Sequence, residues 1–132
     1  MLVLLFNTVE DAINKLSMIK EQLLNLREQY GSIRERLKVN ADMEERLARL
    51  GFQPSHRVIT VQAIPYTLNM HIAPHSTWLL NKLNELDNDI NYVIGEVDKV
   101  SKYLSERVRD RNASVLIVID YSRKRTRLVI MP

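Results

Sequence analysis

Two long runs of apolar residues, spaced three and four positions apart, constrain what this chain can fold into. The first run spans Val9–Leu37 and the second spans Leu79–Leu104. This spacing is the period of the coiled coil, in which the apolar face of one helix packs against a second helix. Because the two runs have similar lengths and enclose a segment with strand character, we expect an antiparallel helical hairpin.

The first helix is predicted over residues 8–50. Asn7 and Thr8 can cap its N-terminus, and Gly51 offers a left-handed stop at its C-terminus. Near this C-terminus the strict heptad would place polar residues in the apolar seam, so we expect a stutter or local unwinding. The apolar pattern there moves to Val39, Met43, Leu47 and Leu50.

Two glycines inside the predicted helices suggest an alignment of one helix with the other. If Leu50 lies level with Ser76, the numbers of facing residues sum to 126, as those of Gly31 and Gly95 do. The two glycines would then sit at the same height, which indicates close backbone approach or a shared hinge. The alternative is a break of the first helix at residues 31–32, which would give a three-helix bundle.

Strand signals flank and separate the two helices. The apolar segment 1–6 is typical of a short buried strand, and the alternation over 56–73 predicts a β-hairpin that leads into the second helix at 76–110. A second hairpin is predicted over 114–131. Its continuous apolar run Val115–Ile119 is typical of a central strand, with the N-terminal strand as the third member of the sheet.

The predicted fold class is α+β, with a long antiparallel coiled-coil helical hairpin that carries small β-hairpin or sheet modules at its ends. Residues 1–132 are expected to form a single domain. Such a slender chain leaves apolar surface uncovered, so we expect self-association into a dimer or higher oligomer. Helices on both sides of a β-hairpin resemble the architecture of prefoldin subunits, although the C-terminal hairpin has no place in that pattern. The resemblance would imply a chaperone-like clamp.

Composition argues against several function classes. The chain has no cysteine and only three glycines, which excludes thiolate chemistry and disfavours a loop-built active site. It contains no Gly-rich phosphate loop and no hydrolase motif. The apolar N-terminal segment is too short to cross a bilayer. We therefore expect a protein that is not an enzyme, has no cofactor, does not enter membranes and is intracellular (cytoplasmic).

The three histidines are weak candidates for a metal site. His56, His71 and His75 all fall in or beside the predicted central hairpin. Clustered imidazoles can bind zinc, but no acidic residue occurs between Glu45 and Glu85 to complete a catalytic site. We expect independent, exposed histidines and no bound metal.

The basic C-terminal part of the chain is the strongest functional signal. From Asp98 onward there are nine Lys/Arg against four Asp/Glu, whereas the rest has ten against twelve. Guanidinium groups on a protruding β-ribbon suit phosphate contacts, and about five neutralised phosphates would make binding strongly salt-dependent. We expect DNA or RNA as the partner, with a protein-interaction scaffold lacking any nucleic-acid role as the alternative. The candidate contact residues are Arg107, Arg109, Arg111, Arg123, Lys124, Arg125 and Arg127.

Overall fold

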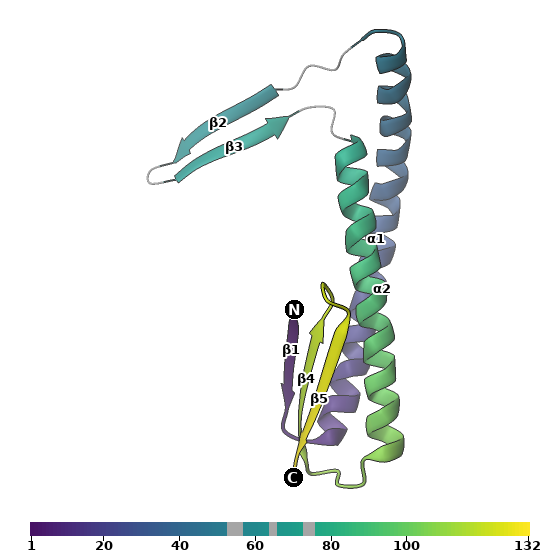
Figure 1. Cartoon of the computed structure of the whole chain (residues 1–132), viewed down its shortest axis with the longest axis vertical. Coiled ribbons are helices and arrows are strands. Elements are labelled where there is room, and N and C mark those ends of the chain that lie inside the picture. Colours follow the sequence, from purple (N-terminus) through teal and green to yellow (C-terminus); the bar gives the residue numbers. More distant parts are fainter. Residues whose placement is uncertain (53–56, 64–65, 73–75) are drawn as a thin grey trace. The chain divides into compact units, whose positions relative to one another are not determined.

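The fold is α+β, with two helices that pack against each other and an antiparallel three-stranded sheet (Figure 1). The computed structural model describes residues 1–52, 57–63, 66–72 and 76–132. Its elements are β1 (Leu2–Phe6), α1 (Val9–Arg49), β2 (Arg57–Ala63), β3 (Tyr66–Ile72), α2 (Ser76–Arg107), β4 (Ser114–Asp120) and β5 (Arg125–Met131). The chain divides into two compact units. The first unit comprises Met1–Gln29 and Glu85–Pro132, and the second comprises Tyr30–Asn84.

The sheet of the first unit confirms the predicted central strand. Its strand order is β1-β4-β5, and both pairings are antiparallel. Ile117 of β4 lies between Leu4 of β1 and Leu128 of β5. Between Ser114 and Asp120 the strand is apolar because helices cover one face, while its other face is half-buried between two neighbouring strands.

The hydrophobic core of the first unit lies between this sheet and the two helices. The buried side chains of α1 and α2 recur at intervals of three and four residues, so each helix turns one apolar stripe toward the sheet. The buried residues of the core are Phe6, Val9, Ala12, Leu16, Val93, Val97, Val100, Leu104, Ala113, Val115, Ile117 and Ile119. In the first unit, the apolar residues that the sequence spaced three and four positions apart therefore do form the buried face of each helix.

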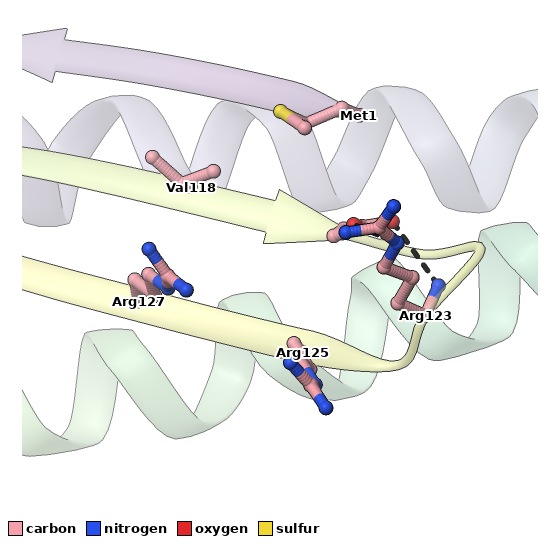
Figure 2. A pocket seen from close by; sticks show the side chains of 6 residues that line it. Met1, Val118, Arg123, Arg125 and Arg127 are labelled. Carbon is pink, nitrogen blue, oxygen red and sulfur yellow. Dashed lines mark hydrogen bonds and ion pairs between the residues drawn. The ribbon is translucent and has the colours of Figure 1, made fainter.

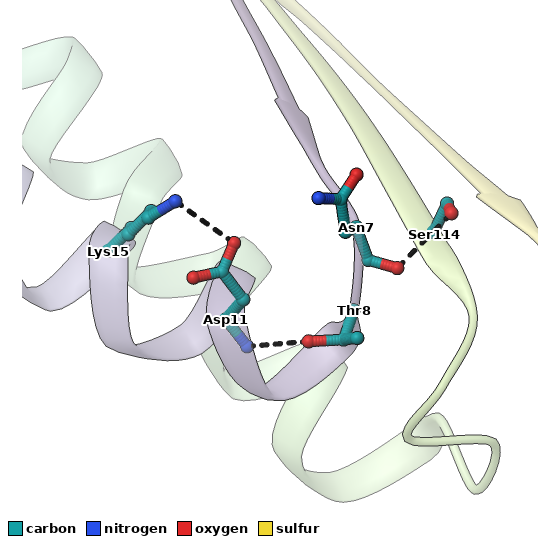
Figure 3. Close-up of polar contacts among 5 residues, drawn as sticks. All are labelled: Asn7, Thr8, Asp11, Lys15 and Ser114. Atoms are coloured by element: carbon teal, nitrogen blue, oxygen red, sulfur yellow. Dashed lines mark hydrogen bonds and ion pairs between the residues drawn. The ribbon is translucent and has the colours of Figure 1, made fainter.

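The start of α1 is fixed to the sheet by polar contacts (Figure 3). Thr8 Oγ1 accepts a hydrogen bond from the Asp11 backbone N–H at 3.1 Å, which confirms Thr8 as the N-cap. Asp11 in turn forms an ion pair with Lys15 at 3.1 Å. The Ser114 hydroxyl donates to the Asn7 carbonyl at 3.2 Å, which joins the loop before α1 to the central strand.

Both helices are continuous over their full lengths. α1 passes through Gly31 without a break, so the alternative of a three-helix bundle is wrong. α2 ends at Arg107 rather than Asp110, because the Asp110 carboxylate accepts from the Asn112 backbone N–H at 3.0 Å and forms a turn. Within the described ranges, neither helix has a stretch apolar enough to span a membrane.

The alignment of the helices differs from the one that the glycines suggested. In the first unit Lys20 Nζ donates to Asp98 Oδ1 and Arg27 Nη1 donates to Asn91 Oδ1, both at 2.7 Å. The numbers of these facing pairs sum to 118, not 126. Among the described atoms, a Cβ added at either mid-helix glycine would meet nothing within 4 Å, so close backbone approach does not explain the glycines.

In the second unit a partly buried polar contact joins the two helices. The Ser76 hydroxyl at the start of α2 donates to the Glu44 carboxylate of α1 at 2.7 Å. The carboxylate also lies where the N-terminal end of the α2 dipole favours negative charge. Asn40, which the strict heptad would place in the seam, is exposed, and its neighbour Ala41 is half-buried instead. The seam therefore departs from the strict heptad, but the predicted shift to Val39, Met43, Leu47 and Leu50 is wrong, since these residues are exposed.

The hairpin that the alternation predicted is present as β2 and β3. Ile59 pairs with Met70, and Val61 pairs with Leu68. The hairpin closes between Ala63 and Tyr66, which are cross-strand partners. Apolar residues of one strand are therefore paired with apolar residues of the other.

Candidate functional site

The seven basic candidates fall into two groups at opposite ends of β4. Arg107, Arg109 and Arg111 precede β4, whereas Arg123, Lys124, Arg125 and Arg127 follow it. A strand of seven residues separates the groups by roughly 20 Å. The basic residues thus do not form one continuous surface patch.

The group before β4 is partly structural. The Arg111 guanidinium donates to the Ser105 carbonyl at 3.2 Å near the end of α2. The Arg111 carbonyl accepts from the Val9 backbone N–H at 3.2 Å. Arg111 therefore joins the ends of both helices, while Arg107 and Arg109 are exposed.

Lys124 is directed toward α2 rather than toward the arginines. Its Nζ lies 3.5 Å from the Asp89 carboxylate and 4.6 Å from the centre of the Tyr92 ring. Its backbone has a φ of 53°, a left-handed conformation that side chains other than glycine rarely adopt. Lys124 thus closes the β4–β5 turn against the helix.

The three remaining arginines surround a hollow on the outer face of the sheet, the face turned away from the helices. We call it the arginine hollow. Its volume is about 300 Å³, and it is lined by Met1, Val118, Asp120, Arg123, Arg125 and Arg127. Figure 2 shows Arg125 and Arg127 along β5, Val118 on the central strand, and Met1 next to β1 on the far side of that strand. The alternating exposure of β5 places Arg125 and Arg127 on the same face.

Asp120 organises the edge of the arginine hollow. One carboxylate oxygen accepts from the Arg123 backbone N–H at 3.1 Å, and the other lies 3.9 Å from Arg123 Nε. Arg125 is the cross-strand partner of Asp120, but the carboxylate is directed to Arg123 instead. Among the described residues, no carboxylate lies within ion-pair distance of Arg125 or Arg127. The hollow therefore carries net positive charge and suits an anionic group.

Apolar side chains border the arginine hollow on the same outer face. Val3 and Leu5 of β1 are 57% and 66% exposed, and Val129 and Met131 continue the exposed positions of β5. The outer face thus combines a basic end with an apolar end. A ligand with one anionic part and one apolar part, or two separate partners, would match it.

The inner face of β5 lies beside a charged group of α2. Glu96 of α2 accepts a hydrogen bond from Lys99 Nζ at 2.8 Å and lies beside the Thr126 hydroxyl of β5. The hydrogen bond from Lys99 and the neighbouring Thr126 hydroxyl hold the pKa of the Glu96 carboxyl below its usual value, although partial burial acts in the opposite direction. The strand that presents the arginines therefore has its inner face beside Glu96 of α2.

The histidine candidates are not brought together by any described contact. His56 and His75 lie outside the described residues, and only the backbone of His71 is described. In the part of the chain that the structure describes, no three His, Asp or Glu side chains gather as metal ligands.

Comparison of the chain with protein-family models, with curated protein sequences and with solved structures finds no match. The resemblance to prefoldin subunits therefore depends on the order of elements alone. Because a fold does not determine function, a function has to be inferred from the residues of the arginine hollow.

Sequence reasoning overlooked three residues that shape the site. Asp120 fixes the turn, and Asp89 and Tyr92 hold Lys124 away from the hollow. An aspartate directly before a predicted turn is a common turn former, so Asp120 carried a signal in the sequence. Asp89 and Tyr92 carried none, because only the folded chain brings them to the turn.

Proposed function

We propose that this chain is a non-enzymatic, self-associating protein that binds nucleic acid through the arginine hollow. The observation that carries the proposal is the pair Arg125 and Arg127, which share one face of β5 and have no carboxylate partner among the described side chains. Two guanidiniums two residues apart on a strand are spaced to contact phosphates along one backbone. Nucleic acid as the partner implies an intracellular site of action.

Duplex is the expected form of the nucleic acid. Binding to single strands usually relies on aromatic side chains on which bases stack. Tyr121, the aromatic nearest the hollow in sequence, packs against the core, and Tyr103 belongs to α2. Phosphate contacts without stacking favour a double-stranded backbone.

The helices serve this function as a support and as an association surface. We propose that α1 and α2 form an antiparallel coiled-coil hairpin, an arrangement supported by the three-four spacing and by the facing pairs Lys20–Asp98 and Arg27–Asn91. Such a hairpin would hold the sheet rigidly while leaving the arginines accessible.

Two double variants with equal charge change test the proposal. Arg125→Gln with Arg127→Gln removes two charges from the hollow, and Arg107→Gln with Arg109→Gln removes two from the other group. In a salt series with duplex DNA, duplex RNA and single strands, the hollow variant should lower the slope of log affinity against log salt by about 1.8 for duplex DNA. The control variant should change the slope less. Absence of binding by the unaltered chain at low salt would disprove the proposal, and equal effects of both variants would disprove the role of the hollow.

A protein-interaction scaffold is the second candidate, favoured by the exposed aliphatic residues Val3 and Leu5 on the same outer face. Under this alternative the hollow variant retains assembly with its protein partner. Loss of that assembly on Leu5→Lys, without any nucleic-acid binding by the unaltered chain, would support the scaffold.

A further inference from the structure

A stripe of apolar residues on α1 of the second unit is exposed along its whole length. We call it the α1 stripe; it consists of Val39, Met43 and Leu47 of α1 and of Leu50 directly after the helix, whose backbone N–H still donates to the Arg46 carbonyl. The exposed fractions of the four residues are 63%, 57%, 43% and 73%. Single exposed aliphatic residues are ordinary, but four at helical spacing form a continuous apolar surface. The stripe is therefore suited to a second helix.

The α1 stripe lies opposite the face that α1 turns to α2. Successive helix residues are rotated by about 100°, so Val39, Met43 and Leu50 fall within about 40° of one another. The half-buried residues Leu37 and Ala41 fall on the other side of the helix. A helix that is apolar on two opposite sides is built to pack between two neighbours. α2 supplies one of them.

Two unpaired charges border the α1 stripe on one side. Asp42 and Arg46 are four residues apart, a spacing that favours an ion pair within the helix, and the next such pair, Glu45 and Arg49, is formed. In the described part of the chain neither Asp42 nor Arg46 has an oppositely charged group within 4 Å. Together with two stripe residues they line a shallow hollow of about 220 Å³, formed by Val39, Asp42, Met43 and Arg46.

We infer that the α1 stripe binds the same stripe of a second copy of this chain, with the two α1 helices antiparallel. Across a two-fold axis near residue 44, Asp42 of each copy faces Arg46 of the other, so both charges gain a partner. A parallel pair would place this charged flank against the flank of Leu47 and leave the charges unpaired. Charge complementarity therefore selects both the occupant and its direction. The inference rests on the self-association in the proposed function and assigns it a surface.

A matched pair of methionine variants tests the surface. Met43 and Met18 both lie on α1, with exposed fractions of 57% and 60%, and only Met43 belongs to the stripe. Light scattering from micromolar to near-millimolar concentration should give the unaltered chain and Met18→Lys twice the 15.4 kDa chain mass. Met43→Lys should give 15.4 kDa. Circular dichroism would establish that each variant remains helical.

Charge exchange tests the antiparallel direction. Asp42→Arg alone places two arginines face to face, and Arg46→Asp alone places two aspartates face to face. Each single variant should weaken dimerisation at least tenfold. The double variant recreates the pair with reversed signs and should recover the dimer to within about threefold of the unaltered chain.

The remaining outcomes overturn the inference in distinguishable ways. An unaltered chain that remains at 15.4 kDa at every concentration disproves self-association, and the stripe is then covered by another segment of the chain or by another protein. A dimer that survives Met43→Lys, or that Met18→Lys also dissociates, uses another surface; the inference then fails while the proposed self-association stands. Failure of the double variant to recover disproves the antiparallel register.

Discussion

The backbone of Lys124 shows how one residue sets the shape of the basic hairpin. Its left-handed φ lets a four-residue turn join β4 to β5, and its side chain reaches Asp89 and Tyr92 on α2. The side-chain contacts offset the conformational cost of a residue with a Cβ in this region. Lys124 is consequently a structural residue rather than part of the arginine hollow.

Two substitutions at this position separate the backbone cost from the side-chain contacts. Lys124→Ala and Lys124→Gly both remove the ion pair and the ring contact, but only glycine adopts the left-handed conformation freely. We expect Lys124→Gly to be more stable than Lys124→Ala by about 1 kcal/mol in urea unfolding. Equal stability of the two variants would mean that the turn does not keep this conformation in solution.

Glu96 gives the first unit a defined dependence on acid. Its folded-state pKa is lowered by the hydrogen bond from Lys99 and by the Thr126 hydroxyl, so its contribution to stability is complete above the unfolded value of 4.5. That contribution disappears as the pH falls through the lowered folded-state pKa. We expect Glu96→Gln to be less stable than the unaltered chain by about 0.5 kcal/mol at neutral pH. Below pH 4.5 the difference should shrink, because the glutamate itself becomes neutral. Unfolding free energies measured across this range would contradict the assignment if the difference stayed constant.

At the scale of the element, the mid-helix glycines weaken the helices without serving a contact. Gly31 and Gly95 are inside continuous helices, and a Cβ at either would meet no described atom within 4 Å. Gly31→Ala and Gly95→Ala should therefore each stabilise the chain by up to about 1 kcal/mol. Gly51, with a φ of 84°, is the matched control, and its alanine variant should be destabilised by a similar amount. Thermal unfolding of the three variants would refute the assignment if the mid-helix alanines lowered the midpoint.

The elements could be predicted from the sequence because each has its own period. The continuous run Val115–Ile119 identified the central strand, and Thr8 identified the start of α1. The alignment of the helices could not be predicted in the same way. Sliding an antiparallel partner by about two turns brings apolar residues back into contact, so a register sum of 126 fits the pattern nearly as well as 118. Specific polar pairs such as Lys20–Asp98 distinguish the two registers. The spacing of apolar residues contains no information about these pairs.

The site was predictable only in part for a related reason. Alternation along a strand places Arg125 and Arg127 on one face, and that inference needs no more than the period of two. The direction of Lys124 depends on contacts from α2, and the separation of Arg107 from the hollow depends on the length of β4. Because the seven basic residues are close in sequence, the sequence alone predicted a larger basic surface than the structure has.

At the scale of the whole molecule, the apolar burial of the described residues is concentrated in the first unit. All buried aliphatic and aromatic residues of the described structure belong to that unit, and Ser76 is the buried residue described in the second. The described side chains of the second unit therefore provide little apolar burial to oppose local opening. A partner on the α1 stripe would bury further apolar surface there.

Amide hydrogen exchange along α1 measures this difference within a single helix. Residues near Leu16 are packed in the core, whereas those near Met43 are on an exposed segment of the second unit. In dilute solution the amides around Leu16 should exchange at least about a hundredfold more slowly, each tenfold corresponding to about 1.4 kcal/mol of local stability. Uniform protection along α1 would instead show that the two units open together. Raising the protein concentration separates the sources of protection further: if copies associate through the α1 stripe, exchange should slow around Met43 in the unaltered chain and stay unchanged in Met43→Lys.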